Sequence, residues 1–295
     1  MVFNTNILAG SGGQAGDAVF SPKGAFLPNT SAGGLNYLFT SCTANATVSS
    51  SSSTLIANTR KASWSYWIYP SQISAANVGF GRHIYPFLAG KINGNDTNGT
   101  QITSQYSFFH RKGDGAGQYA MIMSPPSGSY MFIGSNVPGI FITDQWNCIQ
   151  ISFNTSVTTV GNIYVNDSHK ASIGMTSSVF FNTAGASRFY IGSSFVGPST
   201  VHAAYRGGLA EYYYAPGQYI NFNIESNRRK FINADGTPVD LGADGSTPTG
   251  SRPMLYLSLR DGEAATEFAT NRGFGSNFTI KTSISILDVA VSASV

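Results

Sequence analysis

The sequence predicts an all-β sandwich, and three observations lead to this prediction. Apolar residues make up 42% of the 295 residues and aromatic residues 13%, which is ample for a core, whereas charged residues make up only 11%. Short runs rich in β-branched and aromatic residues recur between Gly, Pro and Asn. Only residues 224–232 show helical spacing. Many short strands separated by turn signals are typical of a sandwich or a barrel, and the length suits one large domain.

The first part of the chain carries little periodic signal. Residues 1–35 are rich in Gly, Ser, Ala and Asn, so we expect an extended N-terminal arm. The polar run Ser49–Ser53 is expected to be a loop.

The first core strand is predicted at residues 63–70, a run dense in aromatic side chains that ends at a proline. Side chains alternate along a strand, so its apolar residues divide between two faces. One face carries Trp64, Tyr66 and Ile68, and the opposite face carries Trp67 and Tyr69.

Further strands follow the same pattern, and a turn is predicted at Asn93–Gly99. These strands are expected at residues 84–92, 106–110, 118–123, 130–133, 146–153, 162–167, 188–192, 208–214 and 254–259. One short helix is expected at 224–232, because cations in its last turn suit the helix dipole and the next four residues favour a stop. We expect its basic end, Arg228–Lys230, to be solvated.

Charge and cysteine content exclude several classes of protein. The net charge is only +3 and the single dense basic run is Arg228–Lys230, so nucleic acid is not an expected partner. No apolar run reaches the roughly 18 residues of a membrane span, so no membrane insertion is expected. Cys42 and Cys148 make no disulfide framework, and Cys148 is expected to be a buried free thiol. The N-terminal residues do not resemble a secretory signal.

Three stretches together resemble a laminin-G-like, concanavalin A-like domain: Ser63–Pro70, Trp146–Asp167 and Arg188–Pro216. The resemblance implies a jelly-roll β-sandwich over residues 36–281. Residues 1–35 would then be the arm, and residues 282–295 a C-terminal tail or an added strand.

The C-terminal part resembles a narrower group, the tailed-bacteriophage virion proteins that carry such a domain. The segments that carry this resemblance are Ala215–Tyr219, Glu225–Ile232, Asp235–Gly250 and Asn271–Thr279. It implies synthesis in the cytoplasm of the bacterial host and a place on the virion surface, which explains the missing export signal and the free cysteines. The implied partners are other virion proteins of the capsid or tail, host-surface glycans as a further possibility, and further copies of the chain in a homo-oligomer.

No catalytic residues are predicted. Glucanases of this fold use a Glu-x-Asp-x-Glu pattern, and the only glutamates four apart, Glu263 and Glu267, lack the central Asp. We interpret that pair as a solvated turn. Glu211 is isolated on its strand, so a structural hydrogen bond or a solvated position is expected.

No metal site and no cofactor are predicted. The histidines have no metal-ligand spacing and are expected to be surface or hydrogen-bonded residues: His83, His110, His169 and His202. Two oxygen-rich stretches, Asn93–Asn98 and the loop with Asp235, Asp240 and Asp244, could hold calcium, but side chains stabilising turns are the better interpretation.

Aromatic side chains could bind sugar, but no carbohydrate site is located by the sequence. The tryptophans lie in strand-like runs and are expected in the core: Trp64, Trp67 and Trp146. The freer candidates are loop tyrosines: Tyr85, Tyr106 and Tyr130.

Together these observations favour a non-enzymatic structural protein of the particle exterior, either a head decoration or a fibre component, which docks through its N-terminal arm. The alternative is a tail-associated adhesin that binds host-surface glycans. Glycan hydrolysis ranks lowest.

Overall fold

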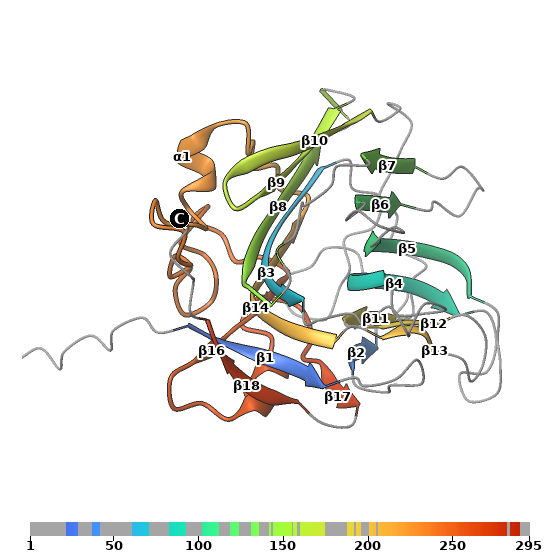
Figure 1. Ribbon diagram of the computed structural model, residues 1–295, viewed down its shortest axis with the longest axis vertical. Coiled ribbons are helices and arrows are strands. Elements are labelled where there is room, and N and C mark those ends of the chain that lie inside the picture. Colours follow the sequence, from blue (N-terminus) through green and yellow to red (C-terminus); the bar gives the residue numbers. More distant parts are fainter. Residues whose placement is uncertain are drawn as a thin grey trace, which may run out of the picture.

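A computed structural model shows an antiparallel β-sandwich with very little helix, as predicted (Figure 1). It describes residues 22–28, 37–41, 61–70, 83–92, 102–111, 119–123, 131–135, 142, 144–154, 156–157, 160–174, 188–191, 193–195, 201–204, 206–281 and 284–289. The fold is thus the all-β, jelly-roll sandwich of concanavalin A-like type that the sequence indicates. Among the helices of these ranges, none is long and apolar enough to cross a membrane.

The larger sheet has the strand order β10-β9-β8-β3-β14-β1-β16, with β15 paired to β14 and β18 paired to β1. Its strands are β1 (Pro22–Pro28), β3 (Lys61–Pro70), β8 (Asn147–Asn154), β9 (Val160–Val165), β10 (Ser168–Gly174), β14 (Arg206–Pro216), β15 (Leu255–Leu257), β16 (Leu259–Arg260) and β18 (Ser285–Asp288).

A second sheet has the order β17-β2-β11-β4-β5. Its strands are β2 (Tyr37–Ser41), β4 (His83–Ile92), β5 (Ile102–Arg111), β11 (Arg188–Ile191) and β17 (Thr279–Lys281). Two further strand pairs form two-stranded sheets of their own: β6 (Tyr119–Met123) with β7 (Met131–Ser135), and β12 (Ser193–Phe195) with β13 (Val201–Ala204).

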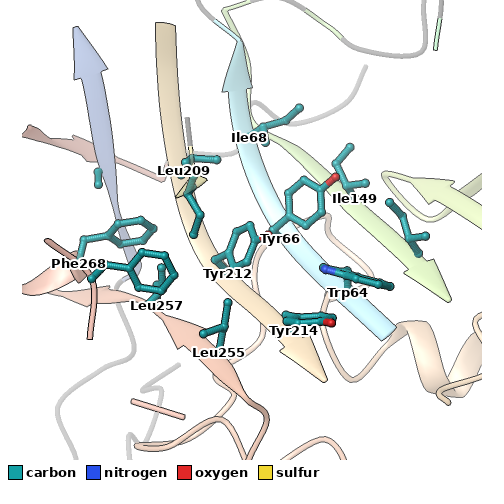
Figure 2. Packing of buried hydrophobic residues seen from close by; sticks show 14 of the residues in the cluster. Trp64, Tyr66, Ile68, Ile149, Leu209, Tyr212, Tyr214, Leu255, Leu257 and Phe268 are labelled. Atoms are coloured by element: carbon teal, nitrogen blue, oxygen red, sulfur yellow. The ribbon is translucent and has the colours of Figure 1, made fainter. Parts of the chain in front are cut away.

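The predicted alternation of β3 is confirmed. Trp64, Tyr66 and Ile68 lie in the main core on the inner face of the larger sheet (Figure 2). Trp67 and Tyr69 pack on its outer face. Aromatic rings of β14 stack on those of β3, with ring centroids 4.5 Å apart for Trp64 and Tyr214. This face buries large rings at offset-stacking distances that add to the stability of the core.

The segment 217–253 forms a third layer on the outer face of the larger sheet, on the side away from the second sheet (Figure 1). It includes the short helix α1 (Glu225–Arg228), which confirms the predicted helix in a shorter form. Its apolar side chains pack on outward-facing residues of the sheet: Ile220, Phe222, Phe231 and Leu241 against Tyr164, Tyr213 and Tyr256. The outer face of the sandwich is therefore covered rather than solvated.

The ends of the chain take part in the larger sheet. Residues 22–28, which we expected in the extended arm, form β1 and pair with β14 along residues 25–28. The sequence signal was weak there because Pro, Gly and Lys interrupt the apolar pattern. Residues 285–288 of the expected tail or added strand form β18, which pairs with β1.

Candidate functional site

A β-bulge in β14 places Glu211 on the outer face. The pairing of β14 with β3 shifts by one residue between Ala210 and Tyr213, and Glu211 has a φ of +44°. Strict alternation would put Glu211 on the same inner face as Leu209. The inserted residue turns Glu211 outward and returns Tyr212 to the inner core.

Glu211 is the centre of a buried polar cluster. Tyr256 Oη donates to its Oε2 at 2.7 Å, and Arg260 Nη1 donates to its Oε1 at 2.6 Å. Arg260 Nη2 also donates to Tyr256 Oη at 2.6 Å and lies 3.3 Å from Oδ1 of Asp240. The side chain of Glu211 is only 2% exposed, whereas that of Arg260 is 23% exposed.

Burial raises the pKa of Glu211, and the charge of Arg260 with the Tyr256 hydroxyl works against that rise. Burial likewise raises the pKa of Tyr256, and the Glu211 carboxylate adds to it. Desolvation would lower the pKa of Arg260, but Glu211 and Tyr256 together, through their charges and hydrogen bonds, outweigh it and the pKa is raised. Both carboxylate oxygens of Glu211 are engaged inside the protein, so this residue holds the bulge of β14 to strands β15 and β16. The first of our two expectations, a structural hydrogen bond, is confirmed.

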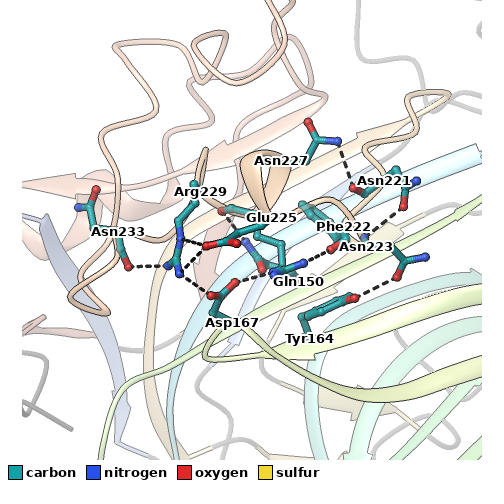
Figure 3. Close-up of polar contacts among 11 residues, drawn as sticks. Gln150, Tyr164, Asp167, Asn221, Phe222, Asn223, Glu225, Asn227, Arg229 and Asn233 are labelled. Atoms are coloured by element: carbon teal, nitrogen blue, oxygen red, sulfur yellow. Dashed lines mark hydrogen bonds and ion pairs between the residues drawn. The ribbon is translucent and has the colours of Figure 1, made fainter.

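A second polar cluster joins the β9–β10 hairpin to α1 (Figure 3). Asn166 and Asp167 have φ values of +48° and +64°, as in the two-residue hairpin turns that match strand twist. Asp167 accepts from Arg228 Nε at 2.5 Å and from Arg229 Nη2 at 2.6 Å. Arg229 Nη2 also lies 3.3 Å from Oε1 of Glu225.

The expectation that residues 228–230 form a solvated helix end is wrong for Arg228, whose side chain is 12% exposed. Its Nη1 donates to the carbonyl of Phe222 at 2.7 Å, and its Cζ lies 4.5 Å from the centroid of the Tyr164 ring. Gln150 Nε2 donates to the backbone carbonyl of Arg228 at 3.0 Å. Lys230 remains exposed. Arg228 thus fastens the third layer to the sheet, through an acidic turn that lies about sixty residues earlier in the chain.

The acidic loop stabilises its own turns, as preferred in the sequence interpretation. Three carboxylates each accept the backbone N–H two residues on, in Asx turns: Asp235 from Thr237, Asp240 from Gly242 and Asp244 from Ser246. Hydrogen bonds from the side chains of Thr237 and Ser246, and then from their backbone N–H groups, lower the pKa of Asp235 and of Asp244. Within the described ranges, no three His, Cys, Asp or Glu side chains gather as metal ligands would.

The side chains of Glu263 and Glu267 lie in different environments. Glu263 accepts from Arg272 Nη2 at 2.5 Å and from the backbone N–H of Arg260 at 2.8 Å. The solvated-turn interpretation is therefore wrong for Glu263. Glu267 is exposed in a short 3-10 turn, Ala265–Ala269, and accepts from the hydroxyl of Thr270 at 3.2 Å.

The remaining candidates behave as follows. Exposed His169 contacts Asn162 and Ser172, as expected of a hydrogen-bonded surface histidine. Tyr85 and Tyr106 lie in strands β4 and β5, in agreement with the strands predicted at 84–92 and 106–110, so the interpretation of both as loop tyrosines is wrong. Backbone positions alone are described for three histidines, in β4, β5 and β13: His83, His110 and His202.

Two further expectations are confirmed and four lie outside the described residues. The three tryptophans are buried, and Cys148 is a buried free thiol. The features outside the described residues are Cys42, Ser49–Ser53, Asn93–Gly99 and Tyr130.

One rigid surface loop was missed by sequence reasoning. Oδ1 of Asn271 accepts the backbone N–H groups of Tyr256 at 2.9 Å and Gly273 at 3.0 Å. Arg252 Nη2 donates to the carbonyl of Gly273 at 2.7 Å. A Cβ at Gly273 would lie 2.5 Å from a backbone oxygen, so a larger residue does not fit. The loop holds Phe274 with 44% of its surface exposed.

Comparison with protein-family models and with curated proteins finds no match. Among solved structures, a native heptameric SAP-like pentraxin from Limulus polyphemus is 11% identical, with 84% of this chain and 95% of that chain covered and a TM-score of 0.47. Domains LG4-5 of the mouse laminin alpha1 chain are 10% identical over 74% of this chain and 49% of that chain, with a TM-score of 0.42. The CBM40 of the Ruminococcus gnavus IT-sialidase, bound to alpha2,3 sialyllactose, is 8% identical over 57% and 80%, with a TM-score of 0.40.

Proposed function

We propose that this chain is a non-enzymatic structural protein on the exterior of a tailed-bacteriophage virion, as a head decoration or a fibre component. The observation that carries the proposal is the role of the C-terminal segment that resembles such proteins. Its distinctive side chains make internal contacts: Arg228 with Asp167, Asp240 with Arg260, and Asn271 with the backbone of Tyr256. The motif is therefore a set of architectural contacts rather than a ligand site.

The same contacts suit a protein exposed outside a cell. The third layer covers the outer face of the larger sheet, and charged contacts join the two, from Arg229 to Asp167 and from Asp240 to Arg260. Proteases cleave locally unfolded segments. Unfolding the covered face of this sandwich requires breaking buried contacts, so we expect it to resist proteolysis. Residues 1–21 are the part of the proposed docking arm that precedes β1.

Cryo-electron microscopy of the intact particle tests this proposal, with the chain fitted into the density. Density on the capsid lattice would identify a decoration or head-fibre protein, and density in a tail fibre would identify a fibre component. Mass spectrometry of purified particles provides a second readout. Absence of the chain from purified particles would refute the proposal.

A tail-associated adhesin that binds host-surface glycans is the second candidate, and the exposed Phe274 ring favours it. A sugar ring presents an apolar face that stacks on an aromatic ring, and a rigid loop loses little entropy on binding. Arg252, whose side chain is 50% exposed, lies beside the loop and would donate to sugar hydroxyls. Phe274→Ala should abolish any signal on an array of bacterial surface glycans, whereas Ile224→Ala, which removes a similarly exposed side chain, should not.

Glycan hydrolysis ranks lowest because the buried carboxylate of Glu211 is engaged by Arg260 and Tyr256. If polysaccharide turnover were observed, it should persist in a folded Glu211→Gln variant. Loss of turnover in that variant, with its fold intact by circular dichroism, would reopen the enzymatic hypothesis.

A further inference from the structure

Strand β18 forms a margin of the larger sheet (Figure 1). It pairs with β1 through residues 285–288, and no other described strand pairs with it. A strand with one unpaired edge presents a row of backbone N–H and C=O groups that can pair with another strand. Such edges are used for recognition by strand addition.

An apolar strip accompanies this edge. Ile286 pairs with Ala25, whose side chain lies in the main core, so both side chains point to the inner face of the sheet. Ile286 nevertheless keeps 47% of its surface exposed. Ile280 and Ile284 pack against the same core and are partly exposed. The edge at β18 thus leaves an inward-facing isoleucine, Ile286, about half exposed.

We propose that β18 is a dimerisation edge, at which a second copy of the chain adds its own β18 in antiparallel register. A twofold axis perpendicular to the sheet keeps the inner faces of both copies on the same side, so only registers that pair residues of equal parity are allowed. The register with Ile286 on the axis places the Ile286 side chains of the two copies against each other. Each then covers the exposed surface of the other.

The charges at this edge suit a second copy. In this register Asp288 lies opposite Ile284 of the second copy, so the two Asp288 carboxylates lie at opposite ends of the strand pair. Lys23 already neutralises Asp288, with its Nζ 2.9 Å from Oδ1. The net charge of +3 gives little repulsion between copies. The proposal concerns the surface of the folded chain and stands independently of the virion role.

Sedimentation velocity of the full chain tests the proposal at concentrations from about 1 to about 100 µM, the range in which a small interface associates. We expect a monomer–dimer equilibrium. Ile286→Lys places two lysines opposite each other and should weaken association at least about tenfold. The matched variant Ile224→Lys alters a side chain of similar exposure, 50%, at the start of α1 and should leave association unchanged.

A cross-linking variant keeps the test decisive if Ile286→Lys does not fold. In Ile286→Cys the two introduced thiols face each other across the axis, so mild oxidation should give a covalent dimer on a non-reducing gel. The parent chain and Ile224→Cys should not give one. A chain that is monomeric at every concentration, association that Ile286→Lys leaves unchanged, or no cross-link in Ile286→Cys would each overturn the proposal.

Discussion

Replacing Arg260 by Met tests whether the contact between Arg260 and Glu211 stabilises the fold. The substitution keeps an aliphatic side chain but removes the guanidinium that contacts Oε1 of Glu211 at 2.6 Å. The carboxylate, 2% exposed, would then be buried with only the Tyr256 hydroxyl as a partner. Breaking a buried ion pair in this way typically costs about 3–5 kcal/mol.

Protonation sets a limit to this cost. In the variant Glu211 can be protonated and so become neutral. Protonating it costs about 1.4 kcal/mol for each pH unit above the ordinary pKa of 4.5. At pH 7 the cost is therefore about 3.4 kcal/mol, and at pH 5 about 0.7 kcal/mol. The folded pKa lies above the unfolded one, so the stability of the variant is lost as pH rises from 4.5 towards the folded pKa. The wild-type chain should show a smaller loss, because the charge of Arg260 opposes the rise of the pKa.

Urea denaturation followed by tryptophan fluorescence at pH 5, 6, 7 and 8 measures the difference between variant and wild type. Lys230→Met removes the same charge from an exposed position and should change the free energy of unfolding by less than about 0.5 kcal/mol. The double variant Glu211→Gln/Arg260→Met should recover part of the loss at pH 7. The reasoning is refuted if Arg260→Met lies within about 1 kcal/mol of wild type at pH 7, or if the difference does not grow with pH.

Three further predictions address packing, acid stability and thiol reactivity. Gly24→Ala would place a Cβ 2.7 Å from Cζ2 of Trp146, so it should destabilise the chain by about 1–3 kcal/mol in thermal unfolding; an unchanged Tm would contradict this packing. Desolvation would raise the pKa of Glu263, but its bonds to Arg272 and neighbouring groups hold it below 4.5. Its contribution is thus present above pH 4.5 and lost as pH falls further, so Glu263→Gln should cost about 1 kcal/mol at pH 7 and less at pH 3. Burial raises the pKa of Cys148, so mass-spectrometric mapping should find it unlabelled by maleimide until urea unfolds the chain; labelling of the native chain would show that Cys148 is accessible.

The strands of the core were predictable because their own sequences carry the signal. In β3 the alternation of apolar side chains already assigned Trp64 and Trp67 to opposite faces, and both are buried as expected. Local patterns suffice here because burial on two faces selects aromatic and β-branched residues whatever the partner strand. The same holds for the buried thiol of Cys148 in β8.

The third layer was not predictable, because its contacts join residues far apart in the chain. Arg228 follows a helix turn and looks solvated by local rules, yet its partner Asp167 lies in a hairpin turn and its ring contact, Tyr164, in β9. Nothing near residue 228 indicates either partner. Likewise β1 has little apolar pattern of its own and is recruited by β14 on one side and β18 on the other.

Glu211 shows how one inserted residue decides between a core and a cluster. By alternation a carboxylate at this position would enter the apolar core beside Leu209, where burying an unpaired charge costs several kcal/mol. The bulge accepts a left-handed φ of +44° at a non-glycine residue, which costs about 1–3 kcal/mol. Accepting the strained backbone to avoid a buried unpaired charge is favourable only if Arg260 and Tyr256 bind the carboxylate on the outer face. The strained backbone of β14 and the adjoining strands β15 and β16 therefore depend on each other, because Tyr256 and Arg260 supply the partners that make this arrangement of β14 stable.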